Sequence, residues 1–176
     1  MSNILTETDR LIIKKFDKGM AQAVHELSLD DANRRFQPDE VFETAEDALD
    51  TIEYLSAHYG NWDAPQVYPV ILKRQGCNIG HVELVPIGGG EWEIGYHIGQ
   101  PFTRKGYASE AVMAFLPVMM EQFGLEYVMG ICAAENLASR GVMEKCGFVR
   151  EFEGTGLYHG QERPICRYRF RLLTEE

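Results

Sequence analysis

Cations and a glycine stand where a strand-like segment passes into a helix-like one, and this combination can bind phosphate groups. The run FTRKGYASEA (residues 102–111) joins the strand-like residues 91–99 to the helix-like residues 108–123. The first turn of a helix has unpaired backbone N–H groups and a partial positive charge, and both attract anions. Gly106 lets a ligand approach the backbone closely, while Arg104 and Lys105 add positive charge. The run predicts a pyrophosphate site, with an ordinary solvated turn as the competing interpretation.

This run matches neither of two common nucleotide-binding motifs. The chain has no Gly-Lys-Ser/Thr tripeptide, which marks the nucleoside-triphosphate loop, and it lacks the three-glycine spacing of dinucleotide-binding folds. The triple glycine at residues 88–90 lies between two strand-like segments, so it predicts a turn.

Length and composition favour one globular domain over residues 1–176, with 45% hydrophobic and 25% charged residues. No apolar run is long enough to span a membrane. Residues 1–10 lack the basic and apolar regions of a signal peptide. We therefore expect a cytoplasmic protein.

The cysteines and histidines do not have the spacing of metal ligands. No Cys-x-x-Cys pair occurs, and the five histidines are scattered. We expect no metal site, and we expect buried thiols rather than disulfides at Cys77, Cys132, Cys146 and Cys166.

The net charge limits the classes of partner. There are 17 Lys and Arg residues against 27 Asp and Glu residues, which gives a formal charge of −10. Such a surface repels nucleic acid and anionic membranes. It suits a cationic substrate such as an amine or a basic peptide, although acidity that serves only solubility is the competing interpretation.

Hydrophobic periodicity predicts an α+β domain on a mixed, mostly antiparallel sheet. Asp17, Thr44 and Asn136 are placed to cap helices, and Pro117 should kink or break the helix that contains it. We expect a loop or broken helix at residues 30–43. The expected strands are residues 10–16, 67–73, 79–85, 91–99, 126–133, 149–156 and 163–172, and the expected helices are 17–29, 44–60, 108–123 and 136–146.

Three motifs together resemble the GCN5-related N-acetyltransferase (GNAT) family, in its RimJ/RimL-like branch that acetylates ribosomal protein N-termini. They are ETDRLII (residues 7–13), EIGY leading into GYASEA (93–96 and 106–111), and NLASR through EKCGF (136–140 and 144–148). Their order and spacing match the family across nearly the whole chain. The resemblance implies the GNAT fold, with a sheet of about seven strands flanked by about four helices.

One position departs from the family's phosphate motif. That motif reads Gln or Arg, two residues, Gly, one residue, then Gly or Ala, and here it falls on residues 103–108. Thr103 replaces the usual Gln or Arg, and the adjacent Arg104 is a candidate for the missing cation. The backbone N–H groups that would bind phosphate depend on Gly106 and the start of the helix, so the change at Thr103 does not affect them.

The resemblance implies acetyl-CoA as the donor and a primary amine as the acceptor, which attacks the thioester directly. It makes Glu93 the candidate general base, acting through water; Glu91 is its rival, and a solvated carboxylate is the structural alternative. Ser139 matches the serine that approaches the CoA sulfur, and a backbone N–H near residues 96–98 would stabilise the oxyanion. Implied CoA contacts are Tyr96, His97, Ile98, Thr103, Arg104, Lys105, Gly106, Tyr107, Ala108, Ser109 and Asn136.

Several alternatives stay open at this point. The branch favours a protein N-terminus as acceptor, whereas relatives with the same motifs use polyamines, aminoglycosides or other small amines. A CoA-binding regulatory module without catalysis is the rival from another class. A homodimer through the last strands or a sheet edge is compatible with the sequence. Trp62, Tyr68 and Trp92 are predicted as core or acceptor-pocket residues, and Tyr158 and His159 as turn residues.

Overall fold

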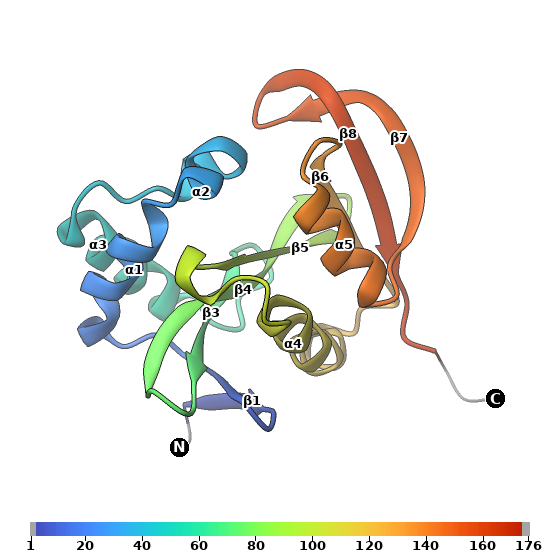
Figure 1. Cartoon of the computed structure of the whole chain (residues 1–176). Coiled ribbons are helices and arrows are strands. Elements are labelled where there is room, and N and C mark those ends of the chain that lie inside the picture. The colour runs from blue at the N-terminus through green and yellow to red at the C-terminus, as the bar shows by residue number, and fades with distance from the viewer. Residues whose placement is uncertain (1–2, 174–176) are drawn as a thin grey trace.

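A mixed eight-stranded sheet organises the computed structural model, which describes residues 3–173 (Figure 1). The strands lie in the order β1-β2-β3-β4-β5-β6-β8-β7. The β5–β6 pair is parallel, and the other neighbours are antiparallel. The strands are β1 Ile4–Glu7, β2 Leu11–Lys14, β3 Gln66–Leu72, β4 Cys77–Gly88, β5 Glu91–Ile98, β6 Val128–Ala133, β7 Val149–Tyr158 and β8 Gln161–Phe170.

Helices cover the sheet in two groups. Helices α1 to α3 lie together on one side of the molecule, and α4 and α5 lie on the other (Figure 1). The α-helices are α1 Ala21–Ser28, α2 Asp31–Phe36, α3 Ala45–Ala57, α4 Tyr107–Phe123 and α5 Leu137–Lys145, and the 3-10 turns are η1 Lys18–Met20, η2 Pro38–Glu40 and η3 Gln100–Phe102.

These elements confirm the predicted α+β class, with one more strand and one more helix than expected. The added strand β1 folds back on β2, and the Thr8 hydroxyl between them accepts a hydrogen bond from the Leu11 N–H at 3.0 Å. The added helix α2 lies in the segment predicted as a loop or broken helix. The buried Asn33 amide holds it by donating to the carbonyls of Ser28 (2.9 Å) and Glu40 (3.2 Å).

Two of the three predicted helix caps form as expected. Thr44 accepts a hydrogen bond from the Asp47 N–H at 3.1 Å, and Asn136 accepts one from the Ser139 N–H at 3.2 Å. The prediction for Asp17 was wrong, because its side chain makes no cap hydrogen bond to η1. The Asp17 carboxylate instead lies 3.7 Å from the ammonium group of Lys14.

Helix α4 runs through Pro117 without a break. Proline removes the hydrogen bond to the carbonyl four residues earlier, which belongs to Met113. Both residues lie on the exposed face of the helix, so water can hydrate that carbonyl. The opposite face buries Phe115 against Tyr68 of β3, with the ring centroids 5.8 Å apart.

Tyr68 and Trp92 belong to the core, whereas Trp62 lies at the surface. Tyr68 and Trp92 are each 2% exposed, while Trp62 is 56% exposed and lies edge-on to Phe123 at 5.2 Å. None of the three lines the large cavity described below. Cys132, Cys146 and Cys166 are buried free thiols, and Cys77 is partly exposed. Among residues 3–173, no helix has the length and apolar character needed to cross a membrane.

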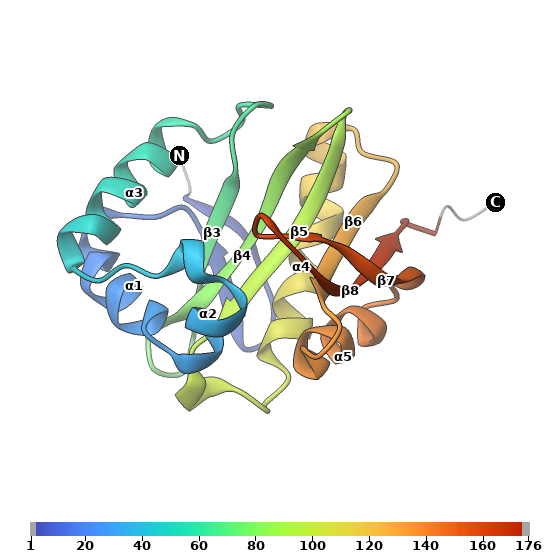
Figure 2. The same cartoon turned by 90° about the horizontal axis from the view of Figure 1, so that it is seen from above.

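The hairpin of β7 and β8 reaches back over the molecule toward α2 (Figure 2). At its tip, the Tyr158 hydroxyl donates to the Phe36 carbonyl at 3.1 Å, and the His159 ring lies 3.0 Å from the Asp39 carboxylate. We call these two contacts the tip bridge. They correct the prediction of ordinary turn residues, since they join segments about 120 residues apart in the sequence.

Candidate active site

One large cavity, of about 1,030 Å³, lies among α2, β5, the start of α4, the start of α5 and the tip bridge. Strand β5 pairs with β4 along its length but with β6 only at Glu93↔Met129. The β6-side edge of β5 beyond Glu93 is therefore left to face the cavity. The predicted site residues that line it are Glu93, Tyr96, His97, Ile98, Thr103, Arg104, Gly106, Tyr107, Ala108, Ser109, Asn136 and Ser139.

Lys105 is the predicted site residue that does not line this cavity. Its carbonyl accepts a hydrogen bond from the Arg10 guanidinium at 3.0 Å. Thr103 lines the cavity, but its hydroxyl donates to the Gln100 carbonyl at 2.8 Å. These contacts give both residues a role in shaping the loop before α4.

The cavity has a cationic end at the start of α4. Gly106 has a φ of +81°, a left-handed conformation that favours glycine, and it precedes the first turn of the helix. A Cβ placed on Gly106 would lie 3.7 Å from the Lys145 ammonium nitrogen and 3.5 Å from Nη2 of Arg10. Arg104 also lines this end. Backbone N–H groups and cations thus converge on one point, as anion binding requires.

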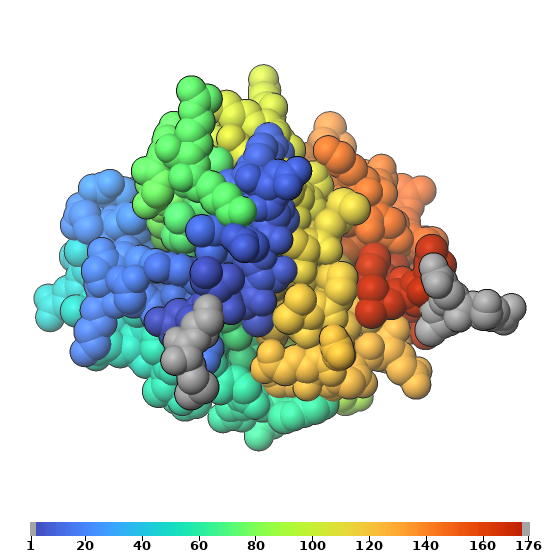
Figure 3. Space-filling view, turned by 90° about the horizontal axis from the view of Figure 1, so that it is seen from below, coloured from blue at the N-terminus to red at the C-terminus, as the bar shows by residue number. Residues whose placement is uncertain are grey.

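Arg10 and Lys145 reach this end from distant parts of the chain. Figure 3 shows the blue β1–β2 hairpin beside the yellow α4. There the Arg10 Nε donates to Glu110 of α4 at 2.7 Å, and its guanidinium lies 4.4 Å from the Tyr107 ring centroid. Neither cation was predicted as a site residue from the sequence. Arg10 lies in the motif ETDRLII and Lys145 in the motif EKCGF. Their place in these family motifs is the sequence feature that could have indicated them.

Tyr96 and Ser139 meet on the wall between β5 and α5. The Tyr96 hydroxyl lies 2.8 Å from the Ser139 hydroxyl and 2.9 Å from the Ser139 carbonyl, to which it donates. Burial raises the pKa of Tyr96 above its usual value, so the phenol stays protonated. The pair offers hydroxyl protons at the side of the cavity where α5 begins.

Glu93 is a half-buried carboxyl in the same cavity. Burial, followed by the nearby carboxyls of Glu83 and Glu40, raises the pKa of Glu93 to about 7. A carboxyl with that pKa can accept a proton near neutral pH. Its rival Glu91 does not line the cavity and accepts a hydrogen bond from the Tyr127 hydroxyl at 3.0 Å. Geometry therefore favours Glu93 as a base.

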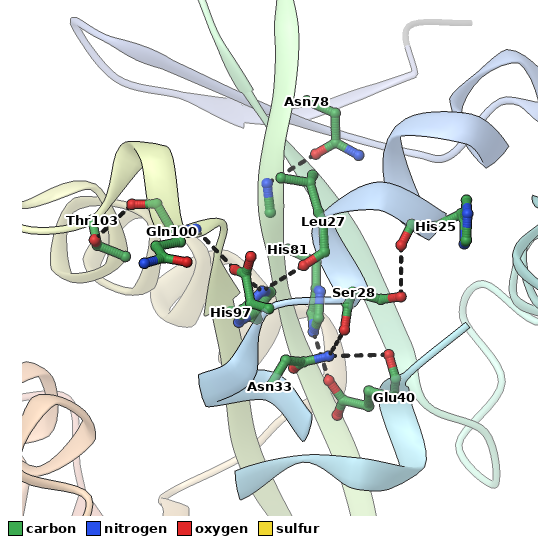
Figure 4. Close-up of polar contacts among 12 residues, drawn as sticks. His25, Leu27, Ser28, Asn33, Glu40, Asn78, His81, His97, Gln100 and Thr103 are labelled. Carbon is green, nitrogen blue, oxygen red and sulfur yellow. Dashed lines mark hydrogen bonds and ion pairs between the residues drawn. The ribbon is translucent and has the colours of Figure 1, made fainter. Parts of the chain in front are cut away.

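His97 anchors β5 to the helical layer through its side chain. Its Nε2 lies 3.1 Å from the Leu27 carbonyl and 3.3 Å from the Asp30 carboxylate, which also accepts from the Gln100 N–H at 2.8 Å (Figure 4). Burial lowers the pKa of His97. The His97 ring thus holds β5 to the end of α1 and to Asp30, which precedes α2.

Carboxyl groups gather around Glu83 in the same cavity. Glu40 of η2 points toward the His81 ring of β4, with Oε2 and Nε2 3.2 Å apart (Figure 4). Among residues 3–173, Glu40, His81 and Glu83 form the group whose donor atoms lie close enough to consider a metal ion, within 4.8 Å of one another. The spacing of residues in the sequence did not predict this group, because Glu40 is far from His81 and Glu83 along the chain.

Comparisons with known proteins agree on the family. A model described as "Acetyltransferase (GNAT) domain" matches residues 10–149. YnaD of Bacillus subtilis (strain 168), described as an uncharacterized N-acetyltransferase, is 35% identical over 145 residues, 82% of each chain. An acetyltransferase (GNAT family) from Bacillus anthracis superposes with a TM-score of 0.80 at 30% identity, covering 94% of this chain and 97% of that one.

A more distant solved structure shares the fold. RimL, a ribosomal L7/L12 alpha-N-protein acetyltransferase in complex with coenzyme A, has a TM-score of 0.80 at 18% identity, covering 96% of this chain and 97% of its own. The family model spans most of this chain, and the two Bacillus relatives cover 82% and 94% of it. The chain is therefore an acyltransferase that belongs to the GNAT family, as its three motifs had indicated.

Proposed function

We propose that this protein transfers an acetyl group from acetyl-CoA to a primary amine by direct attack of the amine on the thioester. The observation that carries the proposal is that both cations and carboxyls line one cavity. Arg104 and Lys145 line it, with Lys145 beside Gly106, and Glu83 lines it over Gly95 with Glu40 and Glu93 nearby. An anionic donor and a cationic acceptor would each meet the opposite charge.

The Gly106 end fits the pyrophosphate of acetyl-CoA. The first turn of α4 offers backbone N–H groups, and Arg104, Arg10 and Lys145 offer positive charge. The β6-side edge of β5 at residues 96–98 suits the amide groups of pantetheine, which pair with backbone. When bound, the donor supplies an acetyl group activated as a thioester.

Glu93 is the proposed general base. The incoming ammonium gives its proton to Glu93, directly or through one water, and the neutral amine attacks the acetyl carbon. A C–N bond forms, and a backbone N–H of residues 96–98 stabilises the oxyanion. The C–S bond then breaks with its electron pair on sulfur. The second proton of the attacking nitrogen passes through the Ser139 hydroxyl, which Tyr96 positions, to the departing thiolate.

The acceptor has two candidate classes, and each has its own support. RimL, whose name assigns it a ribosomal protein N-terminus, has the same fold, and this favours a protein N-terminal amine. The carboxyl groups around Glu83 and the tip bridge favour a slim cationic molecule. A cytoplasmic location and a homodimer stay predictions from the sequence.

The test is to incubate the protein with acetyl-CoA and a panel of amines and N-terminal peptides while measuring free thiol. Thiol release that depends on an added amine, with acetylated product identified by mass, supports the transferase. A melting temperature raised by acetyl-CoA without release for any amine would favour a CoA-binding module without catalysis.

Asn136 tests the donor end, because its cap role and its ligand role can be separated. Asn136→Asp keeps the oxygen that caps α5 but removes the amide N–H donor and adds negative charge. We expect acetyl-CoA affinity to fall by about 10-fold, since one hydrogen bond to a charged ligand is lost, with the melting temperature unchanged. Calorimetry and thermal melts measure the two effects.

Asn136→Ala serves as the comparison, because it also removes the cap. We expect it to destabilise the fold by about 1 kcal/mol and to weaken acetyl-CoA binding to a similar extent as the Asp variant. Full affinity in the Asp variant would limit Asn136 to capping.

A further inference from the structure

Glu83 is a buried carboxyl whose nearest polar neighbours include another carboxyl, that of Glu40. Its side chain is only 9% exposed, and it lines the cavity together with Glu40. A carboxyl oxygen of Glu83 lies within 4.8 Å of one of Glu40, and among residues 3–173 no N–H, hydroxyl or cationic side chain pairs with the Glu83 carboxyl. Such a pair keeps an extra proton or binds a cation, because two buried like charges repel each other.

The backbone opposite Glu83 is shaped to leave room for it. Glu83 of β4 is paired with Gly95 of β5, and a Cβ on Gly95 would collide with the Glu83 carboxyl. The missing side chain lets that carboxyl lie flat over β5, on the face that it shares with Glu93. Any larger residue at position 95 would displace it.

The distance along β5 fits a short diamine. Glu93 and Gly95 are alternate residues on one face of the strand, about 7 Å apart. The Glu83 carboxyl lies over Gly95, so the carboxyl pair and the proposed base are separated by a similar length. Four methylene groups between two nitrogens span roughly 6 Å from standard bond lengths.

We propose that Glu83 and Glu40 form a subsite for a second ammonium group of the acceptor, which makes aliphatic diamines and longer polyamines the preferred substrate class. One amine reaches Glu93 and the thioester while the other is held by the carboxyl pair. The inference rests on the proposed function, and it adds the substrate class and two specificity-determining residues. Because Tyr158 and His159 close over the cavity to Phe36 and Asp39, a slim chain suits it.

The cavity presents two carboxyls to a cation, because Glu40 and Glu83 line it and His81 does not. Nε2 of His81 lies 3.2 Å from Oε2 of Glu40. A metal ion held by Glu40, His81 and Glu83, whose donor atoms lie within 4.8 Å of one another, is the competing occupant that the experiment separates.

The experiment compares 1,4-diaminobutane with butylamine, which have the same chain length but differ by one ammonium group. For the wild-type protein we expect kcat/KM to be about 10- to 100-fold higher for the diamine, as one charged hydrogen-bonding contact provides. Glu83→Gln should reduce that ratio to about 1–3. Assays at about pH 8.5 keep Glu93 deprotonated in both proteins.

Glu40→Gln should reduce the same ratio, and Glu91→Gln is the matched control that should keep it. Calorimetric titration with each amine gives a second readout that does not depend on turnover. Diamine binding that is lost in Glu83→Gln supports the subsite even if no amine is acetylated, in which case the transferase proposal fails alone. Equal kcat/KM for both amines with normal acetylation overturns the subsite alone.

Two further outcomes would also overturn the subsite. One is a basic N-terminal peptide that is acetylated far better than any diamine, with no effect of Glu83→Gln. The other is strong stabilisation by Zn²⁺ but not by 1,4-diaminobutane, abolished in Glu83→Gln, which would assign the cluster to a metal. Thermal melts of each variant confirm folding, and removal of a buried like charge should not lower the melting temperature.

Discussion

Replacing Glu93 with glutamine should lower kcat by about 100- to 10,000-fold, the range that general-base catalysis contributes. The amide is nearly isosteric with the carboxyl but cannot accept a proton from the ammonium. Acetyl-CoA affinity should stay unchanged, because the Gly106 end of the cavity is separate from Glu93. Steady-state thiol release and calorimetric titration measure the two quantities.

The pH profile gives this prediction a second test. The pKa of Glu93 is about 7, and the carboxylate is the active form, so kcat/KM for the amine should rise with pH and change slope near 7. The variant should lose that change of slope. Glu83 and Glu40 lie near the group, and their Gln variants control for indirect effects.

Glu91→Gln is the matched control for the base, since Glu91 lies two residues away and contacts Tyr127 outside the cavity. It should retain full activity. Activity retained by Glu93→Gln across the pH range would remove Glu93 from the mechanism.

Replacing Gly106 with alanine should weaken acetyl-CoA binding by about 10-fold or more. Its φ of +81° costs an alanine about 1–2 kcal/mol, and the methyl group would stand between the helix N-terminus and the cations Arg10 and Lys145. The methyl therefore blocks the approach of a phosphate group. Calorimetric titration with acetyl-CoA measures the loss.

Gly124→Ala separates strain from ligand binding. Gly124 ends the same helix with a φ of +58°, and a Cβ there meets nothing within 4 Å. We expect a similar loss of melting temperature but normal acetyl-CoA affinity. If both variants bind acetyl-CoA equally, the first turn of α4 at Gly106 is not a phosphate site.

Sequence reasoning succeeded where the signal is local. The caps at Thr44 and Asn136 and the turn at Gly106 depend on residues within one helical turn, so the residue types alone indicate them. The same holds for the sheet, since strand periodicity and turn residues lie within each segment. The three motifs then identified the family, because their order spans the chain.

The acceptor end could not be predicted in this way. Glu40 and Glu83 meet only because η2 packs against β4, and each alone resembles an ordinary acidic residue. Lys145 and Arg10 reach Gly106 from opposite ends of the sequence. Asp17 also shows the limit of local rules, because a 3-10 turn and the neighbouring Lys14 replaced the expected cap.

The tip bridge has a consequence for how the protein becomes active during its synthesis. Strand β8 pairs with β6 and β7, so the wall that carries Tyr158 and His159 forms only after the last strand has emerged from the ribosome. The β1–β2 hairpin, α4 and α5 are complete before then. We expect a nascent chain to acquire its phosphate-binding end first and its amine selectivity last, because contacts between distant segments form late.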